Sequence, residues 1–282
     1  MAANTKRKTA QPAVKQKFSG TAGRWQTSRS KAGASRFTPT AIAGLSAADA
    51  VVALTKLGSV SAAAFAQRFF KTGVGQYGAG DAFLGIRVPV LRAFVRDLKG
   101  AGFEVALPLL KSGWHEVRAV ALLLLVRLYE RGDEKTQQRI YSLYLKSTKF
   151  INNWDLVDLS AAPIIGGWLA DKPELRKQVL TRLAKSKSLW ERRIAMLATY
   201  HYIKQGNANE ALHVAKLLLE DKEDLIHKAV GWMLREVGQR VSQEAEEIFL
   251  KQYYRKMPRT MLRYAIERFD EQKRQRYLKG LV

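Results

Sequence analysis

The chain of 282 residues contains no cysteine, and this absence excludes several kinds of chemistry at once. Without cysteine there can be no disulfide, no iron–sulfur cluster, no thiolate zinc site and no cysteine nucleophile. Long apolar runs are also missing: the stretch 119–126 is far shorter than the roughly eighteen residues that a membrane-spanning helix needs. The first residues, MAANTKRKTAQ, lack the apolar segment of a secretory signal.

Acidic residues are scarce, with 25 Asp and Glu against 48 Lys and Arg, which gives a formal net charge of +23. Such a field attracts polyanions, of which nucleic acid is the commonest. Two other interpretations stay open: the charge only keeps the protein soluble, or it binds acidic membranes. Hydrophobic residues make up 47% of the chain, enough for the core of one large or two ordinary domains.

Residues 1–44 contain no acid at all, nine Lys or Arg, and many Ser, Thr, Gly and Ala. They show no hydrophobic period, so we expect a disordered basic tail, followed by one folded domain over 45–282. The tail is interpreted as an arm that adds phosphate contacts, as an organelle transit peptide, or as a dispensable extension.

From Ser46 onward, strand alternation is absent and helix signals follow one another. Ser46 and Ser61 are predicted to cap helices over 46–57 and 61–71, and Pro89 opens another at its first turn. The glycine-rich stretch 72–81 between them lacks the Gly-Lys-Ser/Thr ending of a phosphate-binding loop. Further helices are predicted over 103–111, 114–131, 134–147, 153–170, 173–185, 189–204, 208–220, 223–240, 243–256, 258–269 and 271–280.

These helices have short links and recur in pairs about every 39 residues, as Trp154, Arg193 and Trp232 show by their spacing. The pattern predicts an all-α fold, an α-solenoid of HEAT-like helical repeats. The stacked inner helices of such a solenoid form a concave groove, which the charge balance predicts to be basic.

Even spacing places Trp154, Arg193 and Trp232 at equivalent positions of neighbouring repeats, on the inner face. Asp158 follows Trp154 by one helical turn and shares its face, whereas Leu156 points toward the core. Taken singly, a Trp in a helix is most often a core residue, Asp158 would be solvated or paired with a neighbouring base, and Arg193 would form a surface salt bridge. Their joint spacing favours a chemical site with two aromatic planes, a cation and an acid.

Four segments of the chain resemble the AlkD-type DNA alkylation repair glycosylases. They are FLGIRVPVLR (83–92), NNWDLVDLSA (152–161), LWERRIAML (189–197) and HKAVGWMLREVG (227–238). The resemblance runs from about residue 46 to the C-terminus. It implies a HEAT-like solenoid that cleaves the N-glycosidic bond of cationic alkylated purines, chiefly 3-methyladenine and 7-methylguanine, in double-stranded DNA. It further implies that the base need not be flipped into a pocket.

The same resemblance assigns roles to the spaced residues. It implies that Asp158 is the catalytic acid, that Trp154 and Trp232 contact the sugar, and that Arg193 binds a phosphate. Lys228 is a second candidate for phosphate contact, while Trp190 and Arg87 are weaker candidates for DNA binding. Ten Lys or Arg against three acids in 251–282 fit a duplex-binding surface, or only a solvated one.

The four histidines, His115, His201, His213 and His227, lack metal-ligand spacing and carboxylate companions along the sequence. We therefore predict packing or capping roles for them and expect neither a metal nor a cofactor. No serine or lysine nucleophile constellation is apparent.

Two functions remain: a monofunctional DNA glycosylase, and a non-catalytic HEAT-like DNA-binding protein. Retention of Asp158 with both tryptophans favours the enzyme. We expect a monomer of the bacterial cytoplasm, associated with the nucleoid, that binds DNA and no membrane.

Overall fold

The computed structural model describes residues 44–282, and the predicted N-terminal tail lies outside this part except for Gly44. The described residues form helices joined by short links, with no strand beyond a single bridge between Ala82 and Trp114. The N-terminal helices are α1 (Ala47–Leu57), α2 (Val60–Ala66), η1 (Gln67–Phe69), α3 (Val88–Asp97), α4 (Phe103–Leu110), α5 (His115–Arg131) and α6 (Glu134–Lys146). The prediction of an all-α fold is confirmed for this part of the chain.

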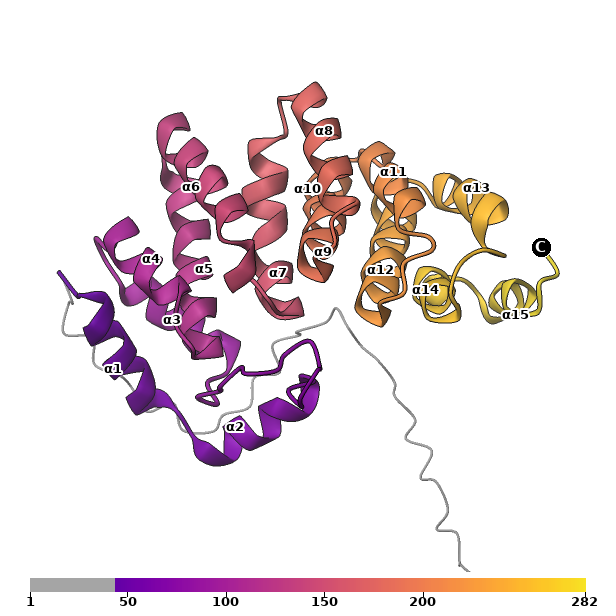
Figure 1. The fold of residues 1–282 in the computed structure, drawn as a ribbon. Coiled ribbons are helices and arrows are strands. Elements are labelled where there is room, and N and C mark those ends of the chain that lie inside the picture. The colour runs from indigo at the N-terminus through magenta and orange to yellow at the C-terminus, as the bar shows by residue number, and fades with distance from the viewer. Residues whose placement is uncertain (1–43) are drawn as a thin grey trace, which may run out of the picture. The chain divides into compact units, whose positions relative to one another are not determined.

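The remaining helices continue the row to the C-terminus (Figure 1). They are η2 (Thr148–Phe150), α7 (Trp154–Ala161), η3 (Ala162–Gly166), α8 (Pro173–Ala184), α9 (Leu189–Ala198), α10 (Tyr200–Ile203), α11 (Asn209–Leu217), α12 (Asp224–Arg240), α13 (Gln243–Tyr253), α14 (Arg259–Ala265), η4 (Ile266–Arg268) and α15 (Glu271–Lys279).

Two layers of helices are evident from the packing. In one layer, α5, α7, α9, α12 and α14 each contact the next, and in the other α8 contacts α11. Links between layers include α5 with α6, α8 with α9, and α11 with α12. This is the pairing expected of stacked helical repeats, and it places α7, α9 and α12 side by side.

Apolar side chains fill the space between the layers. The stretch 119–126 lies in α5, where Val120, Leu122 and Leu125 are fully buried. The stretch is therefore part of the core. No single described helix is long and apolar enough to cross a membrane; α1 with the α2–η1 segment passes such a test only jointly, across a 91° bend.

Three local predictions are wrong in detail. Ser59, and not Ser61, caps α2 by accepting a hydrogen bond from the Ala62 amide at 3.3 Å. The helix predicted over 153–170 changes to a π-turn at Ala162–Gly166, because Pro163 has no N–H to donate to the preceding turn. The helix predicted over 189–204 is interrupted at Thr199, whose hydroxyl bonds to the Met196 carbonyl at 2.6 Å.

The motif FLGI is attached to α5 by a single carboxylate. Glu116 accepts hydrogen bonds from the backbone amides of Leu84, Gly85 and Ile86 at 2.8, 2.7 and 3.2 Å. Gly85 has a φ of +78°, and a Cβ there would lie 2.3 Å from the Ser59 carbonyl oxygen, so no other residue fits. The segment before α3 is thereby held against α5, which packs against α7.

Candidate active site

Helix α7 positions both Trp154 and Asp158. The fully buried Asn153 precedes the helix; its side-chain oxygen accepts from the Trp154 amide at 2.9 Å, and its amide group donates to Asp81 at 3.0 Å. Leu156 is fully buried, as predicted, whereas Trp154 and Asp158 on the other face are half-buried. The start of α7 is therefore fixed by buried polar contacts, and Trp154 and Asp158 keep partial solvent exposure.

Asp158 and Arg193 form a bidentate ion pair. Arg193 Nε lies 2.9 Å from Asp158 Oδ1, and Arg193 Nη2 lies 2.8 Å from Oδ2. The third nitrogen, Nη1, donates to the Leu225 carbonyl of α12 at 2.6 Å. Arg193 is 4% exposed, so it does not form the surface salt bridge expected of a single arginine in a helix. Its guanidinium instead links α9 to α7 through Asp158 and to α12 through the Leu225 carbonyl.

The surroundings of Asp158 act on its acidity in opposite directions. Burial raises the pKa of Asp158 above its ordinary value, the Arg193 guanidinium lowers it, and the neighbouring Asp155 carboxylate raises it again. The net direction is upward, because a carboxylate withdrawn from water loses solvation that one cation only partly replaces. A bound cation beside Asp158 would favour its ionised form.

The two tryptophans lie on the helices either side of α9, and different groups hold them. The Trp154 ring stacks on Phe70, with centroids 5.3 Å apart and planes inclined by 17°. The Trp232 indole N–H donates to Glu236 at 3.1 Å, and its ring lies 6.3 Å from Tyr200. Both indoles remain half-buried, so each retains exposed ring surface.

The weaker candidates fall into different surroundings. Trp190 is 9% exposed, and the ring of Tyr77 meets it edge to face at 5.7 Å. Lys228 is 40% exposed at its side chain and pairs with Asp224 at 2.7 Å. Arg87 is exposed just before α3, and no interaction among residues 44–282 joins it to the other candidates. Their roles in DNA binding stay predictions.

The glycine-rich stretch 72–81 contacts the candidate residue Trp190 through Tyr77. This contact is not predicted from the sequence. Burial raises the pKa of the Tyr77 hydroxyl, while Lys71, Lys228 and Trp154 act against that rise. The Tyr77 ring packs edge to face on Trp190, so this part of the stretch lies beside α9. The sequence signal is a tyrosine inside a glycine-rich stretch, and this does not reveal which helices the loop contacts.

A second omission concerns His115, for which the prediction that histidines lack carboxylate companions is wrong. Its Nε2 lies 2.7 Å from Asp155, and its Nδ1 lies 3.5 Å from Asp81. Asp81 also pairs with Arg118 at 2.7 Å. These carboxylates are distant along the sequence, so spacing alone could not reveal them.

The other histidines have single polar contacts. His227 donates to the Asp221 carbonyl at 2.5 Å, His213 lies 3.0 Å from Thr181, and His201 lies 3.0 Å from Gln205. Within residues 44–282, no three His, Asp or Glu side chains are grouped to hold a metal ion.

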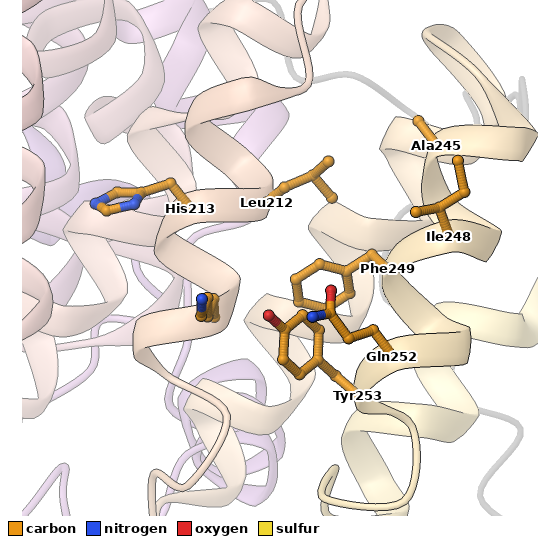
Figure 2. A pocket seen from close by; sticks show the side chains of 8 residues that line it. Leu212, His213, Ala245, Ile248, Phe249, Gln252 and Tyr253 are labelled. Carbon is orange, nitrogen blue, oxygen red and sulfur yellow. The ribbon is translucent and has the colours of Figure 1, made fainter.

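A shallow apolar pocket of about 280 Å³ lies elsewhere, between α11 and α13. Figure 2 shows Leu212 of α11 across from Ile248 and Phe249 of α13. The lining contains none of the candidate site residues, so the site is on the helix row itself and not in this pocket.

Comparisons with known proteins agree with the resemblance drawn from the sequence. A family model described as DNA alkylation repair enzyme matches residues 51–269. A predicted DNA alkylation repair enzyme from Enterococcus faecalis matches with a TM-score of 0.59 and 16% identity, over 76% of this chain and 97% of that one. AlkD2 from Streptococcus mutans matches with a TM-score of 0.50 and 19% identity, over 66% and 91%. A search of curated proteins finds no match.

Proposed function

Because the chain belongs to the DNA alkylation repair enzyme family, we propose that it is a monofunctional glycosylase acting on cationic alkylated purines in duplex DNA. The substrates are 3-methyladenine and 7-methylguanine nucleotides, and the reaction is hydrolysis of the N-glycosidic bond. The observation that carries the proposal is the bidentate Asp158–Arg193 pair, which joins α7 to α9. Trp154 lies one turn before Asp158 on α7, and Trp232 lies on α12, which packs against α9.

The chemistry of the lesion explains why few groups suffice. A purine that carries a positive charge is already a good leaving group and needs little protonation. The sugar becomes cationic as the bond breaks, and a carboxylate near the anomeric carbon stabilises that charge and orients water. Asp158 supplies the carboxylate, and the developing cation favours its ionised form.

The indoles and the arginine complete the arrangement. The electron-rich faces of Trp154 and Trp232 favour cationic character beside them. Arg193 presents a fork of donors that matches a phosphate, so the backbone of the damaged nucleotide can compete with Asp158 for it. Such competition would leave Asp158 free to act on the sugar.

The approach of the backbone to these residues requires no pocket for the base. We therefore expect excision without base flipping, with selectivity set by the charge and lability of the lesion. The net charge of +23 favours sequence-independent binding of the duplex. A non-catalytic HEAT-like DNA-binding protein is the alternative, and it predicts binding without release of any base.

The test is release of 7-methylguanine from methylated duplex DNA under single-turnover conditions, with EDTA present. The wild type releases the base, whereas Asp158→Asn lowers the rate about 100-fold and binds DNA as the wild type does. Asp171→Asn is the matched control, because Asp171 is 78% exposed at its side chain and, within residues 44–282, its ion pair is with its neighbour Lys172. A wild type that binds DNA but releases no base, or an Asp158→Asn variant as fast as the wild type, would refute the assignment.

A further inference from the structure

His115 is the one histidine of residues 44–282 that touches two carboxylates. It is the first residue of α5 and is 3% exposed. It lies 2.7 Å from Asp155 of α7 and 3.5 Å from Asp81, the last residue of the glycine-rich stretch 72–81. Asp155 is adjacent to Trp154 and precedes Asp158 by three residues. The His115 side chain is therefore joined directly to the turn that carries both candidate residues.

Ring contacts join the same side chain to the other support of Trp154. The His115 ring lies 4.9 Å from Phe70 and 4.8 Å from Phe83. Phe70 in turn stacks on Trp154 at 5.3 Å. One imidazole thus contacts both the beginning of α7 and the ring that covers one face of Trp154.

Charged groups around His115 hold it protonated at neutral pH. Burial by itself lowers the pKa of His115, but Asp155 and Asp81 outweigh burial and raise the pKa to about 9, with Arg118 acting against them. These three residues are the charged groups that face the ring, from α7, from the loop and from α5 itself. The ring remains an imidazolium until the solution becomes alkaline.

We propose that His115 is a positioning residue for base excision, which fixes Trp154 and Asp158 by holding Asp155 and Phe70. The role rests on the glycosylase activity proposed above. Loss of the imidazolium leaves Asp155 without its cation, so the first turn of α7 loses its ion pair with α5. The Asp155 charge also then acts more strongly on Asp158, whose pKa it already raises.

The experiment compares the wild type with His115→Gln at saturating enzyme from pH 6.5 to 10. We expect the variant to excise 7-methylguanine about tenfold more slowly at pH 7, with DNA affinity within about twofold, because small displacements of reacting groups are costly. The ratio of the two rates falls toward one as the pH passes about 9. Taking the ratio removes changes in the reactivity of the lesion itself with pH.

His213→Gln is the matched control, because His213 is exposed on α11 and contacts only Thr181 among the described residues. If His115→Gln fails to fold by circular dichroism, Asp155→Asn decides the question: it removes the charge of a partly exposed partner and is expected to show the same pH-dependent ratio.

The possible outcomes separate the two proposals. A wild type without base release overturns the glycosylase assignment. An active wild type whose rate equals that of the His115 or Asp155 variant, or exceeds it by a factor that stays constant with pH, overturns the positioning role alone.

Discussion

The two tryptophans of the candidate site are supported in contrasting ways. The orientation of Trp154 depends on Phe70, which stacks on its ring, and on His115, which contacts the adjacent Asp155. Phe70 and His115 are both far from Trp154 in the sequence. Trp232 depends mainly on its own helix, since Glu236 accepts from the indole and also pairs with Arg240 at 2.6 Å. The orientation of Trp154 therefore depends on how the segment around Phe70 and helix α5 pack against α7. The orientation of Trp232 depends mainly on α12 itself, because Glu236 lies one turn away on the same helix.

The contrast extends to the charges. On the Trp154 side, His115 forms ion pairs with two carboxylates, Asp155 at 2.7 Å and Asp81 at 3.5 Å, which together raise its pKa. On the Trp232 side, Glu246 of α13 is 2% exposed, and its Oε1 has no hydrogen-bond partner among the described residues. We therefore expect the ionised form of His115 to stabilise the fold and the ionised form of Glu246 to destabilise it.

The largest expected effect is on the pH dependence of stability. The pKa of His115 is raised to about 9, so its contribution is complete below the unfolded value of 6.5 and is lost as pH rises through about 9. We expect a loss of about 3 kcal/mol, or a melting temperature lower by roughly 9 °C at pH 10 than at pH 6.5. Calorimetry of the wild type and His115→Gln measures it, and an identical pH dependence in both would contradict the prediction.

The next effect concerns the ring support of Trp154. Phe70→Ala removes the stacked ring and is expected to slow excision about tenfold, because the indole loses its fixed orientation. Phe65→Ala is the control, since Phe65 is 57% exposed. Single-turnover rates of the two variants should differ; equal rates would show that Phe70 does not orient Trp154.

A smaller effect is expected on the Trp232 side. Glu236→Gln keeps an acceptor for the indole N–H but loses the charge that pairs with Arg240, so excision should slow only about threefold. The same single-turnover assay applies. A loss larger than that of Phe70→Ala would reverse the contrast between the two sides.

The smallest effect concerns Glu246. Burial, and then repulsion from Glu247, raise the pKa of Glu246 to about 8, while Arg235 and Lys273 oppose the rise. Because its folded pKa lies above the unfolded value of 4.5, stability is lost as pH rises from about 4.5 through about 8, and it changes no further once both states are ionised. Glu246→Gln should therefore raise the melting temperature by about 2 °C at pH 9, with no gain at pH 5 and no change in excision. A gain of the same size at both pH values would contradict this.

Local patterns predict most of the helices and fail at identifiable places. Helix limits follow from caps and turn residues, as at Ser46, whose side chain accepts from the Asp49 amide. The π-turn at Pro163 and the interruption at Thr199 were missed because a hydrophobic period continues through both. Within the site, Leu156 was placed correctly because helical geometry alone decides its direction.

By itself, the sequence determined that the chain is helical, that it repeats, and that Trp154 and Asp158 share a face, because four residues make about one turn. It could not determine that Arg193 is buried against Asp158, or that His115, Phe70 and Tyr77 reach the site. Those contacts join residues on different elements. They depend on how α5, α7, α9 and the glycine-rich loop pack, and no local periodicity records that packing.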